Sequence, residues 1–451
     1  MTAVTQSQPR SATPPALVAR IVLWAFVVVN LAIVEVMYFT AGPPAHNTVT
    51  AIGRFFGLHL AFIMALQLLL IARLPFLDRR VGLDRLTTWH RWTGFTLFWL
   101  VLLHPTFVLL GYSQFDRISF LAEIPNLAGQ TPVLLGMIAA SILIIVALLS
   151  TRFARRRLSY ETWHTIHLCM YVVVTLALIH QMYEGTAFKI NTLTQVYWWA
   201  LWAFAIIALI VGRFVLPFWR NARHQLRVAA VVPESANTVS VYMTGKNLDQ
   251  LPARAGQFFL WRFLGYNRWW QVNPWSLSAA PDGRSLRITA KGIGTTSAGL
   301  RELPVGTRVF AEGPYGAFTS MQRTKNATLL IAGGIGITPI RALLEDDRLT
   351  GDIVVLYRVH TEADAVLLGE LENLATARGA RLHVLTGRTG AGSPPNNPFS
   401  PESLAALVPD INDRDVFVCG PAAMMSAVLR SLRALKIPAR QVHDERFRLA
   451  S

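Results

Sequence analysis

Four histidines in two long apolar runs are the residues whose type and spacing point most directly to chemistry. His90 and His104 are 14 residues apart, and His167 and His180 are 13 residues apart. On helices these spacings are about 21 Å and about 19.5 Å along the axis, so the two pairs match in depth. Imidazole is an axial ligand of haem iron, and the core of a helix bundle supplies a dry pocket. The pattern therefore predicts two stacked b-type haem sites, each with one histidine from each helix.

The direction of the side chains around the helix axis fits one run better than the other. His90 and His104 lie within about 40° of each other, whereas His167 and His180 are about 140° apart on a straight helix. A bend, an irregular turn or a tilted helix must correct this second helix. His164, three residues before His167, can replace it as the ligand or can meet a haem propionate.

Other polar groups in the apolar runs have two open interpretations. The histidine pairs are alternatively core residues that hydrogen-bond to their neighbours in the bundle. His59 suits a propionate or a surface partner better than iron, and Glu35 suits a wet position near the end of its run. Arg54 and Arg91 either pair with haem propionates or extend to the membrane interface.

Six apolar runs must position these groups, at residues 21–39, 55–71, 89–111, 132–149, 162–180 and 197–216. Each is close to the ~20 residues that a helix needs to cross about 30 Å of hydrocarbon. Of the 451 residues, 53% are hydrophobic and 15% are charged, against about 25% charged in a soluble protein. This composition excludes a disordered chain, a coiled coil and an ordinary soluble protein, and it predicts an all-α membrane bundle of six helices.

The net charge of +16 follows the membrane topology. Loops after the second and fourth runs hold eight basic residues, whereas the three opposite loops hold one each: Arg73, Arg79, Arg80, Arg85, Arg152, Arg155, Arg156 and Arg157, against Arg54, Arg117 and Lys189. The positive-inside rule then predicts a multi-pass cell-membrane protein with both termini in the cytoplasm and no nucleic-acid partner. The only cysteines, Cys169 and Cys419, make no disulfide framework, which is typical of a reducing compartment. Residues 1–18 are expected to form a tail, since they lack the charged start of a signal peptide.

The second half of the chain has the pattern of a soluble module. Short β-type runs at 226–232, 239–243, 258–262 and 286–290 predict a small antiparallel barrel. From residue 327 strands alternate with helices, with strands expected at 328–332, 353–359, 381–385 and 416–418 and a helix at 339–344. That alternation predicts a doubly wound, parallel α/β sheet.

Two motifs in the barrel region suit a flavin nucleotide. The first is a strand whose backbone, hydroxyl and aromatic group can face an isoalloxazine: Asn273, Pro274, Trp275, Ser276, Leu277 and Ser278. The second follows Lys291, and it places Gly294, Thr295, Thr296 and Ser297 at the start of a helix that is expected from Ser297 onward. Backbone N–H groups there can cradle a pyrophosphate, although an ordinary capped helix start explains the motif equally well.

Two Gly-rich turns in the α/β region suit a nicotinamide dinucleotide. The first joins a strand to a helix through Gly333, Gly334, Gly336, Thr338 and Pro339. Its glycines allow close approach of a phosphate, and a proline suits the first turn of a helix. The second turn is Cys419, Gly420 and Pro421, whose cysteine lies near a nicotinamide or is a small buried residue. Arg358, at a strand end, either pairs with a 2′-phosphate and favours NADPH or is an exposed arginine with no partner.

In combination and order, these motifs resemble the ferric reductase and NADPH oxidase superfamily, in its bacterial form, from about residue 20 to the end. The family signature is His-x13-His on the third helix and His-x12-His on the fifth, here His90/His104 and His167/His180. Residues 273–276 are similar to the family's flavin motif. Asn273 replaces the usual His or Arg, so no charged contact with the FAD pyrophosphate is expected from it. The family's terminal aromatic residue, which covers the flavin, corresponds to Phe447.

The resemblance implies a tail (1–18), a six-helix transmembrane haem domain (19–218), an FAD-binding barrel (219–322) and an NAD(P)H-binding α/β domain (323–451). It implies an NAD(P)H-dependent reductase or oxidase in which FAD and two b-type haems carry electrons across the lipid bilayer. Phe447 and Cys419 are then expected beside the reacting rings. The acceptor outside is oxygen, which gives superoxide, or a ferric or cupric ion. The alternatives are an electron-relay subunit for a partner protein and a histidine-lined metal transporter with a nucleotide-sensing domain.

Overall fold

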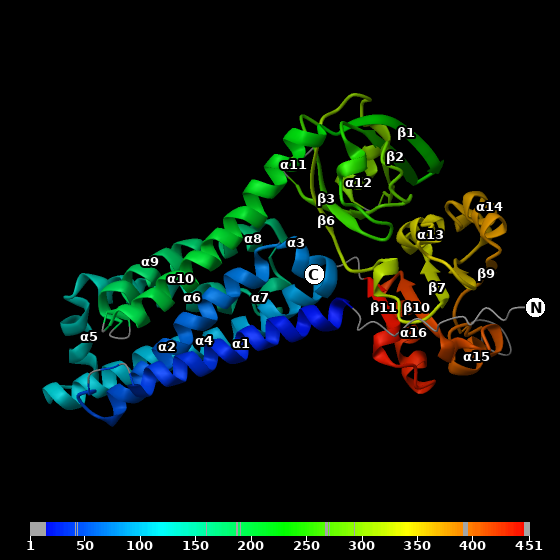
Figure 1. The fold of residues 1–451 in the computed structure, drawn as a ribbon. Coiled ribbons are helices and arrows are strands. Elements are labelled where there is room, and N and C mark those ends of the chain that lie inside the picture. Colours follow the sequence, from blue (N-terminus) through cyan, green and yellow to red (C-terminus); the bar gives the residue numbers. More distant parts are fainter. Residues whose placement is uncertain are drawn as a thin grey trace, which may run out of the picture. The chain divides into compact units, whose positions relative to one another are not determined.

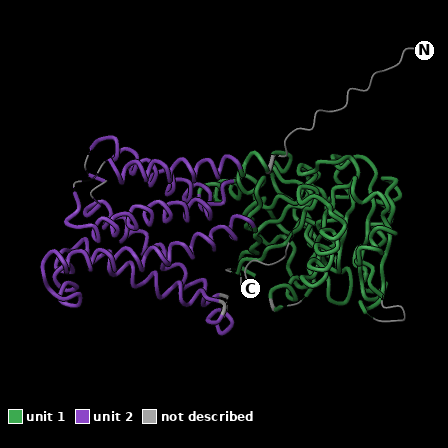
Figure 2. The backbone as a smooth tube through the Cα atoms, turned by 90° about the horizontal axis from the view of Figure 1, so that it is seen from below, with its two compact units in different colours: residues 1–20, 75–84, 215–450 green, residues 21–74, 85–214, 451 purple. Residues whose placement is uncertain are grey.

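The computed structural model describes residues 15–40, 42, 44–158, 160–185, 188–189, 191–266, 269, 271–292, 294–390 and 396–445. It divides into two compact units, which are coloured separately in Figure 2. Unit 1 holds residues 1–20, 75–84 and 215–450, and unit 2 holds residues 21–74, 85–214 and 451. Most of the expected tail and Phe447 lie outside the described residues.

The first half of the chain is helical, as expected. Its helices are α1 (Pro15–Thr40), α2 (Thr48–Ile71), α3 (Pro75–Val81), α4 (Leu83–Asp116), α5 (Phe120–Ala128), α6 (Thr131–Leu149), α7 (Arg152–Arg155), α8 (Tyr160–Leu168), α9 (Met170–Glu184), α10 (Thr192–Ile210) and α11 (Leu216–His224). The long ones run alongside one another in Figure 1. Six helical spans are long and apolar enough to cross a membrane, and they contain all six runs expected from the sequence: Leu17–Thr40, Thr48–Ile71, Leu83–Asp116, Thr131–Leu149, Glu161–Glu184 and Thr192–His224.

The fifth span contains the irregular turn that the 13-residue spacing requires. Helix α8 ends at Leu168 and α9 begins at Met170, with Cys169 between them. The Cys169 N–H donates to the carbonyl of Ile166, three residues back, at 3.0 Å. An i→i−3 bond winds the chain more tightly than the i→i−4 bonds of an α-helix. The histidines on α8 and α9 therefore need not keep the 140° offset of a straight helix.

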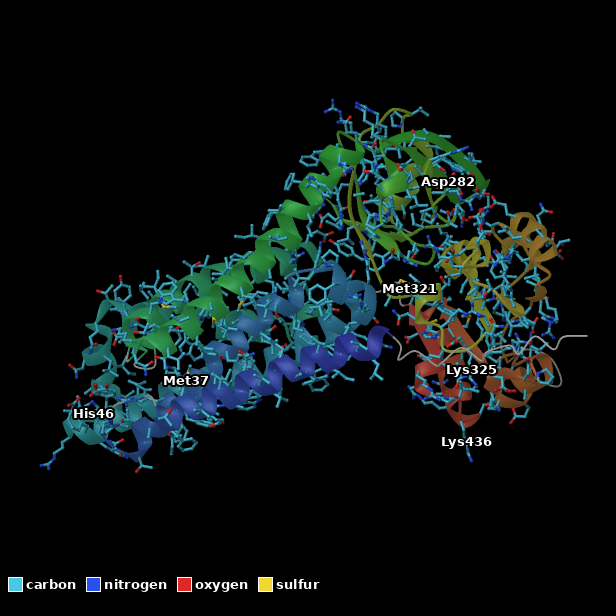
Figure 3. The ribbon with its side chains drawn as sticks, viewed as in Figure 1. Met37, His46, Asp282, Met321, Lys325 and Lys436 are labelled. Carbon is cyan, nitrogen blue, oxygen red and sulfur yellow. The ribbon has the colours of Figure 1, made fainter. Side chains whose placement is uncertain are left out.

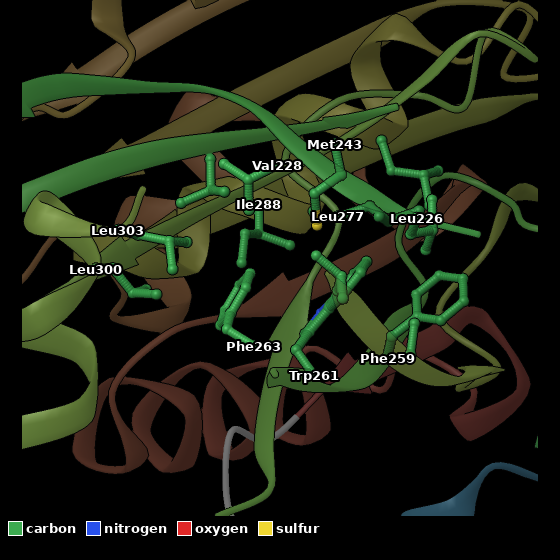
Figure 4. Close-up of a cluster of buried hydrophobic side chains, with 14 of the residues drawn as sticks. Leu226, Val228, Met243, Phe259, Trp261, Phe263, Leu277, Ile288, Leu300 and Leu303 are labelled. Carbon is green, nitrogen blue, oxygen red and sulfur yellow. The ribbon is translucent and has the colours of Figure 1, made fainter. Parts of the chain in front are cut away.

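The flavin region forms two antiparallel sheets of three strands each. One has the order β1-β2-β5 and the other β4-β3-β6: β1 (Arg227–Ser235), β2 (Thr238–Thr244), β3 (Phe258–Phe263), β4 (Asn273–Ser276), β5 (Ser285–Lys291) and β6 (Val309–Tyr315). Phe259 and Trp261 of β3 share one buried cluster with Val228 of β1 and Ile288 of β5 (Figure 4). Single isolated bridges connect the sheets at 227/308 and 277/288. The expected closed barrel is not confirmed, because within the described residues the two sheets stay separate ladders.

The nucleotide region has a five-stranded parallel sheet of order β11-β10-β7-β8-β9, which confirms the doubly wound expectation. Its strands are β7 (Ala327–Gly333), β8 (Ile353–Arg358), β9 (Arg381–Leu385), β10 (Arg414–Cys419) and β11 (Val442–Glu445). Helices α13 (Ile337–Glu345) and α14 (Leu368–Arg378) pack on one face, and α15 (Pro401–Leu407) and α16 (Ala422–Ala434) pack on the other. The strand order reverses between β7 and β10, which is where such sheets bind ligands.

Candidate functional site

The structure brings the four sequence-predicted histidines together as two pairs in unit 2. The rings of His90 on α4 and His167 on α8 have centroids 6.3 Å apart. The rings of His104 on α4 and His180 on α9 have centroids 6.4 Å apart. Each pair joins the third membrane span to the fifth. The ring opposite His90 is that of His167, three residues beyond His164.

Backbone carbonyls orient three of these four rings. Their Nδ1 atoms hydrogen-bond to carbonyl oxygens, His104 to Gly53 and His180 to Pro132 at 2.9 Å and His90 to Gln67 at 3.3 Å. Histidines that bind a metal commonly donate their second ring N–H to such an acceptor, which fixes the tautomer and the ring orientation. Here the bond at Nδ1 leaves Nε2 for a ligand role. Nδ1 of His167 is buried and has no hydrogen-bond partner within the described part of the chain.

A cavity of about 530 Å³ lies at the His104–His180 pair. Met37, which Figure 3 labels, is among its lining residues, and so are Gly57 on α2 and Gly136 on α6. A Cβ atom on Gly57 would lie 2.8 Å from Cε1 of His104, and one on Gly136 would lie 2.8 Å from Cγ of His180. These two glycines let the rings pack directly against α2 and α6. Sequence reasoning missed them, although glycine in an apolar span commonly marks such a close approach.

The residues fit the bis-histidine haems that the sequence predicts. A metal–imidazole bond is about 2.0–2.1 Å, and a ring nitrogen lies about 1.1 Å from the ring centre, so two rings in line across one ion have centroids about 6.3 Å apart. The observed 6.3 Å and 6.4 Å match this spacing. The cavity at the His104–His180 pair and the Nε2 atoms that are left for a ligand role also support haem binding. His90, His104, His167 and His180 are therefore the residues that would hold two haems.

The other polar groups of the bundle that the sequence singled out have different surroundings. Nε2 of His59 lies 3.1 Å from Oε1 of Glu35, so His59 has a carboxylate partner on α1. Arg54 lines the cavity at the His104–His180 pair. Arg91 is exposed.

The flavin motif occupies β4, which pairs with β3. Ser276 is 3% exposed, and its Oγ has no hydrogen-bond partner among the residues that the structure describes. Ser278 differs, because its Oγ accepts from Nε of Arg287 at 3.0 Å and from Oγ1 of Thr289 at 2.8 Å. Of the two serine hydroxyls in the motif, that of Ser276 is therefore available for a cofactor, and that of Ser278 is already bonded. The other members of the motif are half-buried, except for the buried Leu277: Asn273, Pro274 and Trp275.

The second flavin motif forms a short helix, α12 (Thr295–Gly299), two residues earlier than expected. Ser297 lies inside it, and its Oγ accepts from the backbone N–H of Gly294 at 3.1 Å. Thr296 Oγ1 donates to Oε1 of Gln271 at 2.7 Å, which ties this turn to the loop before β4, and Lys291 is exposed at the end of β5. Five residues make little helix dipole, so anion binding here would depend on individual N–H and hydroxyl groups.

The two Gly-rich turns of the α/β region lie against each other at the carboxyl ends of β7 and β10. A Cβ atom on Gly336 would lie 2.4 Å from the carbonyl oxygen of Cys419, and one on Gly420 would lie 3.1 Å from Cα of Gly333. Close backbone packing thus requires glycine at 336 and 420, whereas a Cβ atom on Gly333 would meet the side chain of Met424, with its Sδ at 2.4 Å. Gly334 differs, since it has a φ of +50° and nothing within 4 Å of its Cβ position. It is therefore the glycine of this turn whose Cα faces open space.

The remaining candidates of the nucleotide site have plain environments. Thr338 and Pro339 are buried in the first turn of α13, and Pro421 caps α16. Cys419 is fully buried in the core, where burial raises the pKa of its thiol. That placement favours the buried-residue alternative. The guanidinium of Arg358 donates to the carbonyl of Thr386 at 2.6 Å, so the alternative of an arginine without a partner is wrong.

Comparison with known proteins gives two family matches. Residues 56–178 match the family described as ferric reductase like transmembrane component, and residues 330–430 match the family described as oxidoreductase NAD-binding domain. The first match lies in the membrane-spanning helices and the second in the α/β region. The chain joins a ferric reductase-like transmembrane domain to an NAD-binding, ferredoxin-reductase-like module. In these two parts of the chain the matches confirm the resemblance seen in the sequence.

Curated relatives resemble half of the chain. The glycine betaine monooxygenase reductase subunit of Chromohalobacter salexigens is 26% identical over 51% of this chain and 65% of its own length. The ferredoxin reductase component of 3-ketosteroid-9-alpha-monooxygenase from Mycobacterium tuberculosis is 30% identical over 50% of this chain and 65% of its own. The chain thus spans less than two thirds of each. Among solved structures, the FAD/NAD binding domain of nitric oxide dioxygenase from Vibrio cholerae is 22% identical, with a TM-score of 0.39 over 50% of this chain and 98% of its own.

Proposed function

We propose that this chain is a transmembrane oxidoreductase that takes electrons from cytoplasmic NAD(P)H and delivers them to an acceptor outside the cell. The observation that carries the proposal is the pair of histidine–histidine distances at two depths of one bundle, next to a module of the NAD-binding reductase class. When bound, NAD(P)H supplies a hydride with its two electrons to FAD, and FAD and the haem irons pass these electrons on singly. The domain limits expected from the sequence belong to this proposal.

The protein's own residues bind and orient the cofactors. His90 and His167 hold the inner haem, and His104 and His180 hold the outer one. Carbonyl bonds to Nδ1 of His104 and His180 orient these rings and leave their Nε2 atoms for the metal. Much of the cavity beside them is lined by apolar side chains.

In the second half of the chain, too, the protein's own residues bind and orient the cofactors. Ser276 offers its buried hydroxyl to the flavin, and the turns at 294–297 and 333–339 receive the pyrophosphates. Arg358 lies at the end of β8, where its guanidinium can pair with the 2′-phosphate of NADPH. Such a pair would favour NADPH over NADH. Phe447, outside the described residues, is proposed to cover the flavin.

Orientation and acceptor complete the proposal. Both termini are placed in the cytoplasm, because eight basic residues between the apolar runs are expected on that side against three on the other, although Arg54 and Arg85 lie inside α2 and α4 rather than in loops. The acceptor is oxygen or a ferric or cupric ion. An electron-relay role for a partner protein is the second candidate, because the curated relatives are named as reductase components of monooxygenases.

Reconstituted vesicles test the function. The full chain, loaded with FAD and haem, is placed in liposomes with NADPH on one side and membrane-impermeant ferricyanide on the other. We expect ferricyanide reduction that depends on both haems. Reduction of an acceptor only on the NADPH side would contradict transmembrane transfer and would favour the relay role. Cytochrome c in place of ferricyanide, with and without superoxide dismutase, then separates oxygen from a metal ion.

A further inference from the structure

A cluster of alternating charges, with buried arginines and partly exposed carboxylates, connects the flavin sheet to the nucleotide-binding helices of unit 1. We define the Arg287 cluster as Arg287 on β5, Glu370 on α14, and Arg341 and Glu345 on α13. Both guanidinium Nη atoms of Arg287 donate to the Glu370 carboxylate, at 2.8 Å and 3.0 Å. Nε of Arg341 lies 2.9 Å from the same carboxylate, and Nη1 of Arg341 pairs with Glu345. Glu370 is therefore shared by one arginine from each half of the module.

The cluster holds the chain segment that follows the flavin motif. Nε of Arg287 donates to Oγ of Ser278 at 3.0 Å, and Nη2 donates to the Ser278 carbonyl at 2.7 Å. The N–H of Ala280 donates to Oε2 of Glu345 at 2.6 Å. Ser278 is thus fixed from the flavin sheet, and Ala280 is fixed from α13. Ser278 and Ala280 lie two and four residues beyond Ser276, whose hydroxyl is available.

On its other side the cluster reaches the nucleotide turn. Helix α13, which carries Arg341 and Glu345, begins at Ile337, directly after the glycine turn over Gly334–Gly336. A rotation of one half of the module against the other would lengthen the contacts that the Glu370 carboxylate makes with Arg287 and Arg341. The cluster therefore sets the distance between the strand that carries the flavin motif and the turn that carries the dinucleotide motif.

The burial of its two arginines indicates a geometric role, although the carboxylates of Glu370 and Glu345 are 37% and 31% exposed. The side chains of Arg287 and Arg341 are 4% and 8% exposed. Buried ion pairs recover little net stability after desolvation, but removal of one partner leaves an uncompensated charge. A bidentate arginine–carboxylate pair also fixes orientation, which a single contact does not. A cluster of this kind suits a place where two halves must meet in one arrangement.

We propose that Glu370, together with Arg287 and Arg341, positions the dinucleotide-binding half against the flavin strand for reduction of the flavin. These are positioning residues, and none of them touches the reacting atoms. The proposal rests on the proposed function, because it needs FAD and NAD(P)H in their two motifs. It concerns residues that the sequence motifs did not single out.

The test compares flavin reduction in the full-chain holoprotein and in Glu370→Gln, which removes the shared charge. Flavin bleaching by NADPH is followed anaerobically by stopped flow. We expect the rate at saturating NADPH to fall at least about tenfold, since an error of about 1 Å in placement can cost about 100-fold. The half-saturating NADPH concentration should change less than about threefold, because the dinucleotide turn is untouched. FAD content, measured on the same sample, should be retained.

Two further variants separate positioning from folding. Glu370→Asp keeps the charge and shortens the side chain, and it should give an intermediate rate. Asp410→Asn weakens the ion pair of a second buried arginine, Arg414. This arginine lies at the amino ends of the parallel strands, opposite the glycine turns. The substitution should lower the midpoint of thermal unfolding and leave flavin reduction unchanged. If Glu370→Gln lost FAD or failed to fold, an intermediate rate in Glu370→Asp would still support the proposal, and a wild-type rate would overturn it.

The remaining outcomes are also distinct. A wild-type rate in Glu370→Gln would overturn the positioning role and leave the proposed function intact. An equal loss of rate in Asp410→Asn would overturn it too, because general loosening would then suffice. A wild-type chain that binds FAD but is not reduced by NADPH or NADH would overturn the proposed function, and the positioning role would fall with it.

Discussion

His104 and His180 come from different membrane spans, and their ring centroids lie 6.4 Å apart. Each ring is fixed by a 2.9 Å bond from Nδ1 to a backbone carbonyl. The ring of His104 lies against Gly57 of α2, and the ring of His180 lies against Gly136 of α6. This is the separation that two imidazoles in line across one metal ion require. The pair is therefore the best-defined part of the proposed electron path.

Removal of either outer histidine should cost one haem of two. We expect His104→Ala and His180→Ala each to retain one haem per chain and to lose electron delivery to an outside acceptor. Flavin reduction by NAD(P)H should stay intact, because its motifs lie after residue 270. Haem per chain by pyridine haemochrome measures the effect. His59→Ala is the control, since Glu35 and not a second imidazole pairs with His59. Two haems per chain in both variants would refute the ligand assignment.

The glycine behind His104 offers a gentler test of the same site. In Gly57→Ala the new methyl group would lie 2.8 Å from Cε1 and 2.9 Å from Nδ1 of the ring, so the ring must shift and its bond to Gly53 must weaken. Loss of such a supporting contact commonly lowers metal-site affinity about 10- to 100-fold. We expect a haem titration to show weakened binding at one site of two. Gly369→Ala in α14, with nothing within 4 Å of the new atom, should bind haem normally. Unchanged affinity in Gly57→Ala would contradict the packing argument.

The sequence was most informative where spacing alone decides the geometry. The depths of His90, His104, His167 and His180 follow from helix rise, and even the need for an irregular turn could be predicted. The glycines at 57 and 136 could not, because their role depends on which helices become neighbours. The barrel was not confirmed for a related reason, since strand patterns predict sheets but not whether their edges pair. The Arg287 cluster escaped prediction because its members lie far apart in the chain.

Cys419 should be chemically inert in the folded protein. Its side chain is fully buried, and burial, with the nearby carboxylates of Glu445 and Asp444, raises the pKa of the thiol. The thiolate is the reactive form of cysteine, so little of it exists at pH 8. We expect iodoacetamide to leave Cys419 unmodified in the native chain and to modify it fully in denaturant, as peptide mass spectrometry would report. Rapid modification of native Cys419 would place it in an accessible site instead.

The α/β half should lose stability in acid through Arg414. Hydrogen bonds from Arg414 lower the pKa of Asp352 and the pKa of Asp410. Both carboxyls therefore release protons more readily in the folded state than in the unfolded one. Their stabilising contribution is complete above the unfolded value of about 4, and it is lost as the pH falls through the lowered folded values.

Thermal unfolding of the wild type and of Asp410→Asn between pH 7 and pH 3 measures this effect. The difference between their midpoints should be largest at pH 7 and should shrink toward pH 3. A difference that does not change with pH would contradict the role of these ion pairs.

The most direct test of the whole account is one absorption experiment. The full chain, loaded with FAD and haem, is kept free of oxygen and mixed with NADPH. We predict that the flavin bands bleach and that two low-spin b-type haems per chain then become reduced, to the extent that dithionite reduces them. A chain that binds no haem, or whose haem is reduced by dithionite but not by NADPH, would contradict the proposed electron path.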